Sequence, residues 1–73
     1  MKVHIEFCVL WNYYPEFDRV SKIINEIDPN ITIDGNKLAP RNGAFEVKID
    51  SIEVFSKLKK YQFPTTDEVK GWF

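Results

Sequence analysis

Cys8 is the side chain in this sequence with the clearest potential for chemistry, and it is the only cysteine among the 73 residues. The residues before it alternate as in a strand, and a helical pattern follows. Amide groups at the start of a helix favour a thiolate, the nucleophilic form of cysteine. Such a thiolate attacks a disulfide, and with one cysteine a second molecule, glutathione or a protein thiol, must complete the reaction. The alternative is that Cys8 is a small apolar side chain packed at the end of a strand.

Apolar side chains follow Cys8 along the chain. They are two aliphatic and three aromatic residues: Val9, Leu10, Trp11, Tyr13 and Tyr14. An exposed cluster of this kind marks a binding site for a partner, whereas a buried one covers a small core. We expect Leu10 to cover the core, and we treat Val9, Trp11 and Tyr13 as candidate binding residues.

Composition argues against several other kinds of site. One cysteine and one histidine supply neither an internal disulfide nor the four ligands of a structural zinc site, so we expect no metal. The net charge of -1 gives no general attraction to nucleic acid, and no apolar run is long enough to span a membrane. No phosphate-binding loop is present, and we expect no cofactor. The lack of an internal disulfide fits a cytoplasmic protein.

The spacing of the apolar residues predicts the elements that position Cys8. Val3, Ile5 and Phe7 alternate with polar residues and form a half-buried strand. A helix with one apolar stripe then runs from Pro15 to Ile27, where an Asp-Pro-Asn sequence ends it. A short strand follows at 31–33.

The second half of the sequence predicts a hairpin and a last helix. Residues 34–43 are expected to form a loop, in which Gly43 is a turn residue with positive φ whose backbone passes close to Cys8. Strands at 45–49 and from Ile52 onward are separated by Asp50-Ser51 and pair as a hairpin. Thr65 and Glu68 have the spacing of a capping box at the start of the final helix.

These elements predict a single domain over residues 1–73. Their order is β-α-β-β-β-α, and the first strand, helix and second strand form a right-handed crossover. Because each strand has one polar set of alternate residues, apart from Phe55, both helices should cover the same face of the sheet. We therefore expect a two-layer α/β (α+β) sandwich with a mixed four-stranded sheet.

Four segments of the sequence also resemble a known family, and together they span nearly the whole chain. They are Val3-His4-Ile5-Glu6-Phe7-Cys8, Trp11-Asn12-Tyr13, the stretch from Pro40 through Gly43-Ala44-Phe45-Glu46-Val47, and Phe63-Pro64. In these segments the chain resembles the selenoprotein W-like (Rdx) family. The resemblance implies a thioredoxin-like fold and a redox motif of the form Cys-x-x-Cys or Cys-x-x-selenocysteine. Cys8 occupies the first position of that motif, and Trp11 occupies the second.

The departure at Trp11 shapes the functional hypothesis. The family position that Trp11 occupies must be reachable for thiol exchange, so we expect Trp11 to be partly exposed. The leading hypothesis is a degenerate selenoprotein W-like protein with one-thiol redox or thiol-binding activity through Cys8, acting on glutathione or a protein partner. The alternative is a non-catalytic interaction module that binds a protein through the 9–14 loop. A homodimer that buries this loop is a third possibility.

Overall fold

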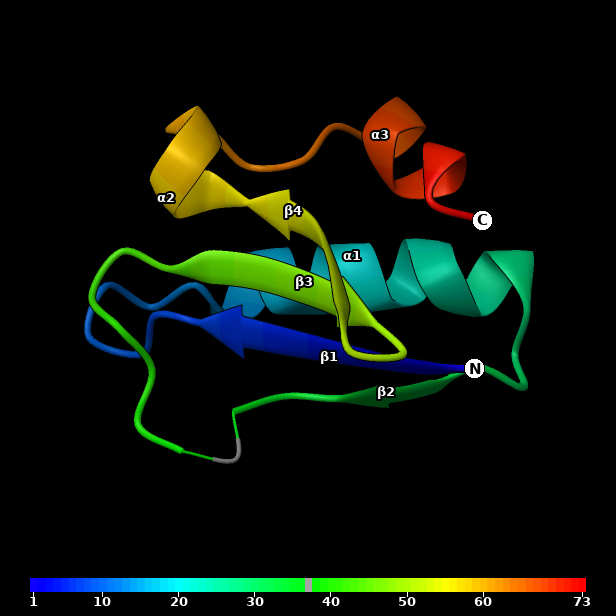
Figure 1. The fold of residues 1–73 in the computed structure, drawn as a ribbon, viewed down its shortest axis with the longest axis horizontal. Helices are drawn as coiled ribbons and strands as arrows, with labels where there is room; N and C mark the ends of the chain where they lie inside the picture. Colours follow the sequence, from blue (N-terminus) through cyan, green and yellow to red (C-terminus); the bar gives the residue numbers. More distant parts are fainter. Residues whose placement is uncertain (37) are drawn as a thin grey trace.

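In the part of the chain that the structure describes, residues 1–36 and 38–73, four strands form one mixed sheet (Figure 1). The structure is a computed structural model, and its elements in chain order are β1 (Lys2–Phe7), α1 (Tyr14–Ile27), β2 (Thr32–Asp34), β3 (Phe45–Ile49), β4 (Ile52–Ser56), α2 (Lys57–Lys60) and α3 (Thr66–Gly71). The strand order is β2-β1-β3-β4, with β1 parallel to β2 and the other neighbouring pairs antiparallel. Lys37, in the predicted 34–43 loop, lies outside the described residues.

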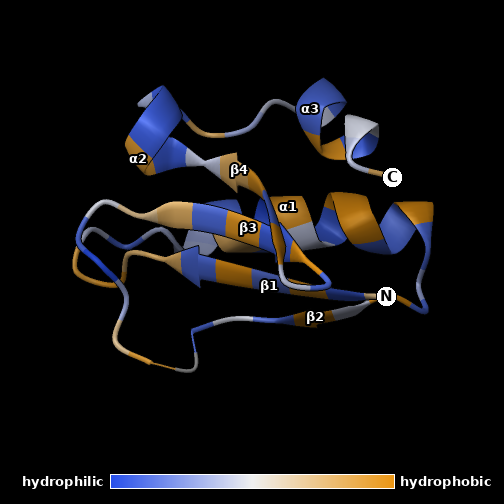
Figure 2. Ribbon diagram, in the orientation of Figure 1, coloured by the Kyte–Doolittle hydropathy of each residue, from blue (hydrophilic) through white to orange (hydrophobic). Residues whose placement is uncertain are grey.

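The hydrophobic core lies between the sheet and α1. In β1, Val3 and Ile5 are fully buried, and hydrophobic and hydrophilic residues alternate along the strand (Figure 2). Because alternate residues of a strand point to opposite faces, the polar set lies on the other side of the sheet. The other core residues come from the remaining elements: Phe7, Val20, Ile24, Ile31, Phe45, Val47, Phe55 and Val69. Alternation also predicts that Ile33 and Ile49 lie on the buried face, and the structure has both only partly buried. The predicted two-layer sandwich with a mixed four-stranded sheet is confirmed.

The β3–β4 hairpin explains why Phe55 departs from the alternation of its strand. A register shift at Val47/Lys48 leaves Val54 without a partner, so that Phe55 pairs with Val47 and Glu53 pairs with Lys48. One extra residue reverses the side to which the following side chains point, and Phe55 is therefore buried. The turn has φ of 47° at Asp50 and 72° at Ser51, the positive values that a two-residue hairpin requires.

The two predicted helices are present, and the structure adds a third. The basic segment Lys57–Lys60, for which the sequence pattern predicted no helix, forms the one-turn helix α2 at the end of β4. The Ser56 hydroxyl accepts a hydrogen bond from Lys59 N–H at 3.3 Å, and this cap starts the helix. In α3 the predicted capping box of Thr65 and Glu68 is confirmed.

The long helix and the final segment complete the layer that covers the sheet. α1 begins at Tyr14, one residue before the predicted Pro15, and ends at Ile27 as predicted. Val69 of α3 is buried, and the Trp72 ring lies 5.9 Å from the Phe55 ring. No helix in residues 1–36 or 38–73 is long and apolar enough to cross a membrane.

Candidate functional site

Cys8 lies directly after β1, and its side chain is buried. The residue is 1% exposed and its thiol is free. Its N–H donates to the Ala44 carbonyl oxygen at 2.9 Å, which continues the pairing of β1 with the β3 segment. The N–H of Trp11 donates to Cys8 Sγ at 3.4 Å. Burial keeps a disulfide away from the sulfur, so the neighbouring side chains must move before Cys8 can react.

Residues 8–13 form a tight turn that separates Cys8 from α1. Tyr13 N–H donates to the Cys8 carbonyl oxygen at 3.0 Å, and Asn12 N–H donates to the Val9 carbonyl oxygen at 3.0 Å. Asn12 has φ of 55°, a left-handed conformation that asparagine tolerates better than most residues. The prediction that N–H groups at the start of the helix donate to the Cys8 sulfur is therefore wrong. The donor is the backbone N–H of Trp11 in the turn, and α1 starts only at Tyr14.

The side chain of Trp11 packs against the backbone of Gly43. Gly43 has the predicted positive φ, 75°, and a Cβ added to it would lie 2.7 Å from Cζ3 of the indole. Trp11 nevertheless remains 58% exposed, as the sequence predicted. The loop also passes close to Cys8 as predicted, through the adjacent Ala44. The contact with Trp11 explains why residue 43 must lack a side chain.

The residues around Trp11 differ in exposure. Val9 is 45% exposed and Leu10 is 73% exposed, so the expectation that Leu10 covers the core is wrong. Leu10 lies within the tight turn of residues 8–13. Val9, Leu10 and Trp11 together form an exposed surface that we call the apolar turn. Tyr13 does not belong to it, because its ring is half-buried and meets the Phe63 ring edge-on at 4.7 Å.

Two polar side chains, Asn36 and Glu6, connect described residues between β2 and β3 to the end of β1. The side-chain amide of Asn36 donates to the Phe7 carbonyl oxygen at 2.8 Å, and its oxygen accepts from Phe7 N–H at 2.9 Å. Asn36 therefore occupies the backbone groups at the end of β1 as a paired strand would. Farther along the loop, the Glu6 carboxylate accepts from the Arg41 backbone N–H at 2.8 Å and from Arg41 Nη2 at 2.9 Å.

Arg41 also separates two carboxylates on the open face of the sheet. Glu6 and Glu46 are direct cross-strand partners, and Glu46 is only 4% exposed. Like charges on directly opposite residues repel. Arg41 Nη2 lies 3.6 Å from Glu46 Oε1, and its positive charge offsets this repulsion. Hydrogen bonding from Arg41 holds the pKa of the Glu6 carboxyl below its ordinary value. The same pair raises the pKa of Arg41.

The sequence led to Cys8, Trp11 and Gly43, which the structure brings together, but it did not lead to Asn36 or Arg41. Alternation had placed Glu6 and Glu46 on one face, and two carboxylates on one face imply a cation nearby. Nothing in the sequence identified Asn36, whose role depends on the position of a distant strand end. Among the described residues, no group of three or more His, Cys, Asp or Glu side chains could hold a metal ion.

Comparison with known proteins places this arrangement in a family. The model of the Rdx family matches residues 2–71 of the chain. No curated protein matches the sequence significantly. The family assignment is therefore supported by a match over nearly the full length of the chain, and not by similarity to a curated protein.

Two solved structures are similar in fold. One is a selenoprotein W-related protein from Vibrio cholerae, with 18% identity and a TM-score of 0.80 over 96% of this chain and 88% of that chain. The other is a protein from Bordetella parapertussis, with 11% identity and a TM-score of 0.76 over 96% of this chain and 89% of that chain. At these identities the likeness concerns the fold.

Proposed function

The chain belongs to the Rdx family of selenoprotein W-like proteins, a thioredoxin-like family of redox type, and from this premise we propose that it is a protein-interaction module. Its contact surface is the apolar turn. The observation that carries the proposal is the contrast between neighbours: Cys8 is 1% exposed, whereas Leu10 and Trp11 are 73% and 58% exposed. The chain offers apolar area where a catalytic thiol would be expected to be accessible.

The turn has the properties of a docking surface. Its backbone is held by hydrogen bonds from Asn12 and Tyr13, so that little conformational freedom is lost when a partner binds. Trp11 supplies a large, partly anchored aromatic ring, a residue type that dominates binding energy at interfaces. The partner best suited to it is a protein segment with an apolar pocket or groove. A second copy of this chain is one such partner.

A capture experiment with matched variants tests the proposal. The tagged protein, Leu10→Asp and Ile52→Asp are used to capture proteins from a lysate, and the captured proteins are quantified by mass spectrometry. Ile52 is a suitable control because it is 69% exposed but lies in the hairpin, away from the apolar turn. We expect a specific set of proteins to be lost at least tenfold with Leu10→Asp and retained with Ile52→Asp. Equal recovery with Leu10→Asp and the unmodified chain would contradict the proposal.

The oligomeric outcome is measured separately. If the partner is a second copy, the mass in solution rises with concentration for the unmodified chain and for Ile52→Asp, but not for Leu10→Asp. Light scattering over a hundredfold range of concentration distinguishes this case from a different protein partner.

The second candidate function is one-thiol exchange at Cys8, and the hydrogen bond from Trp11 N–H to Cys8 Sγ favours it. In this reaction the Cys8 thiolate attacks oxidised glutathione, a bond forms between the two sulfurs, and one glutathione thiolate leaves. Because Cys8 is 1% exposed, the surrounding side chains would have to move aside first. The expected product is the protein carrying one glutathionyl group.

Replacement of Trp11 separates the two functions. If Cys8 is a shielded nucleophile, Trp11→Ala should form the glutathione adduct at least tenfold faster than the unmodified chain, as measured by intact mass. Cys8→Ser serves as the control and should form no adduct. If Cys8 stays unmodified in the unmodified chain and in Trp11→Ala until each protein unfolds, the exchange reaction is ruled out. This result would leave the interaction function unaffected.

A further inference from the structure

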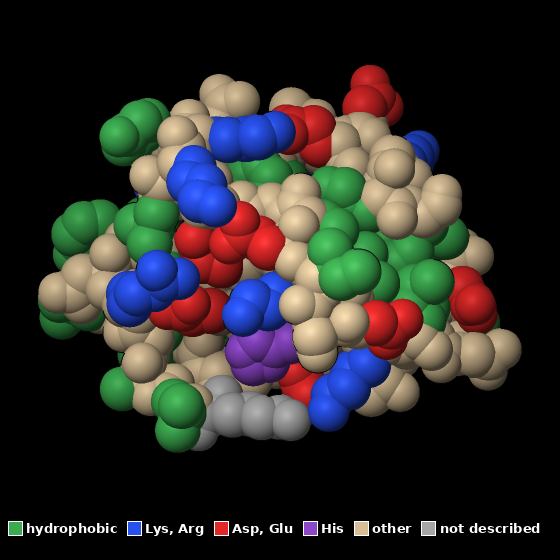
Figure 3. All heavy atoms as spheres, viewed as in Figure 1, with side chains coloured by type: hydrophobic (Ala, Val, Ile, Leu, Met, Phe, Trp, Pro, Cys, Tyr) green, Lys and Arg blue, Asp and Glu red, His purple; other side chains and the backbone are tan. Residues whose placement is uncertain are grey.

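The face of the sheet opposite α1 is not flat. In the space-filling view this face carries charged side chains around the single histidine (Figure 3). β1 forms its floor, and residues of the 34–43 loop, including Leu38 and Ala39, line it together with the polar strand residues. The resulting open depression has a volume of about 830 Å³. Depressions of several hundred cubic ångströms are the size that small molecules occupy in proteins.

One row of side chains crosses all four strands, and its members Asp34, His4 and Lys48 line the depression. Asp34 of β2 is the partner of His4 in β1, His4 is the partner of Lys48 in β3, and Lys48 is the partner of Glu53 in β4. Residues in such a row point to the same face of the sheet and lie close enough to contact one bound group together. The row places the two basic side chains at its centre and a carboxylate at each end.

The carboxylates in and beside this row are already paired. Asp34 lies 3.3 Å from Lys2 Nζ and 2.6 Å from His4 Nδ1. Glu53 lies 2.8 Å from Lys59 Nζ, and Glu6 is bound by Arg41. These pairs reduce the repulsion that an incoming anion would otherwise meet.

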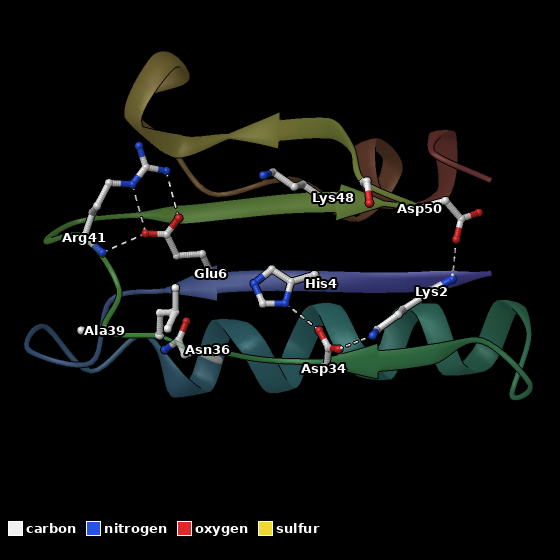
Figure 4. Close-up of a pocket in the computed structure, with 11 residues that line it drawn as sticks. Lys2, His4, Glu6, Asp34, Asn36, Ala39, Arg41, Lys48 and Asp50 are labelled. Carbon is white, nitrogen blue, oxygen red and sulfur yellow. Dashed lines mark hydrogen bonds and ion pairs between the residues drawn. The ribbon is translucent and has the colours of Figure 1, made fainter.

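His4 and Lys48 retain unused capacity to donate hydrogen bonds. Within residues 1–36 and 38–73, Lys48 makes no ion pair and Nε2 of His4 has no hydrogen-bond partner. The bond from Nδ1 to Asp34 fixes the ring so that Nε2 points away from Asp34 (Figure 4). A protonated imidazole donates from both nitrogens, one to Asp34 and the other to a ligand.

We propose that the depression binds a small organic anion, whose carboxylate or phosphate group lies between Lys48 and His4 and whose apolar part contacts Leu38 and Ala39. Lys48 contributes a mobile ammonium group, and His4 contributes a donor oriented by Asp34. Asn36 also lines the depression, and its side-chain amide already makes two hydrogen bonds to the backbone of Phe7. The site lies on the face opposite α1 and is independent of the function proposed for the apolar turn.

Three probes with the same ring test the proposal: benzoate, phenyl phosphate and benzyl alcohol. Each is titrated into the protein, and amide and imidazole resonances are followed by NMR. We expect saturable shifts at His4, Lys48 and Ala39 with at least one anion, and binding of benzyl alcohol at least tenfold weaker. The comparison of the two anions decides whether the site prefers a carboxylate or a phosphate. Absence of saturable binding by both anions, or equal binding of benzyl alcohol, would overturn the proposal.

Variants then locate the site. Lys48→Gln and His4→Gln should each weaken binding of the better anion at least fivefold. Lys22→Gln makes the same change of charge on α1, which lies on the other side of the sheet, and should leave affinity unchanged. Equal weakening by Lys22→Gln and Lys48→Gln would show general attraction to net charge and would refute the site. Undiminished binding by both Lys48→Gln and His4→Gln would refute it as well.

Discussion

The two faces of the sheet use alternate residues of the same strands in opposite ways. On the side of α1, side chains such as Ile5 and Phe45 are fully buried and contribute through close packing. On the open side, His4 pairs with Asp34 and Glu6 pairs with Arg41, and solvent screens both charge pairs. The covered face therefore carries most of the stability, while the open face can change its side chains, or accept a ligand, without loss of the fold.

The largest expected effect comes from the covered face. Phe45→Ala removes a fully buried ring that contacts the Phe63 ring at 5.6 Å, and it should lower the free energy of unfolding by about 3–5 kcal/mol. Lys48→Ala, in the same strand but on the open face, should change it by less than about 0.5 kcal/mol. Denaturant unfolding measures both values. Similar losses in the two variants would break the distinction between the faces.

An intermediate effect is expected at Gly43, where the loop meets Trp11. In Gly43→Ala, a side chain at a φ of 75° should lower stability by about 1–2 kcal/mol, and the new Cβ should also displace the indole. Gly71→Ala is the matched control, because no atom lies within 4 Å of the new Cβ. We expect Gly71→Ala to leave stability unchanged or to raise it by up to about 1 kcal/mol.

Removal of the indole separates two contributions to the stability lost in Gly43→Ala: backbone strain and the clash with Trp11. In a Trp11→Ala background, the contact with the indole no longer contributes, and only the backbone strain remains. The double variant should therefore lose less stability than the sum of the single variants. Strict additivity would mean that Trp11 does not pack on Gly43 in solution.

The smallest expected effect comes from the open face and depends on pH. Because Arg41 lowers the pKa of Glu6 below 4.5, the pair stabilises the folded protein above that pH. This contribution is lost as the pH falls through the folded-state pKa of Glu6. For so exposed a pair it is about 1 kcal/mol or less. Unfolding measured at pH 7 and at about pH 3 should show a smaller difference in Glu6→Gln than in the unmodified chain.

Asp18→Asn provides the control for the pH experiment. Asp18 is exposed and makes no ion pair in the part of the chain that the structure describes. The difference in stability between pH 7 and pH 3 should therefore be nearly unchanged in this variant. A pH dependence in Glu6→Gln equal to that of the unmodified chain would show that the bond to Arg41 is not maintained in solution.

Several features of the fold could be predicted because they depend on neighbours in the sequence. Alternation identified β1 and β3, and helical spacing identified α1, since each element repeats its own period along the chain. The capping box at Thr65 and the positive φ of Gly43 likewise follow from local chemistry. The one-turn helix α2 was missed, because four residues are too few to show a period and its start depends on the Ser56 cap.

In the candidate site, too, some features follow from the sequence and others only from the tertiary structure. The sequence by itself determined that Cys8 follows a strand, that a second sulfur is absent, and that an apolar turn lies beside it. Only the tertiary structure decided that Cys8 is buried while Leu10 is exposed, because burial depends on what the 34–43 loop and the sheet place around each side chain. The row from Asp34 to Glu53 likewise exists only in the folded protein, since strand pairing brings together residues from four separate parts of the chain.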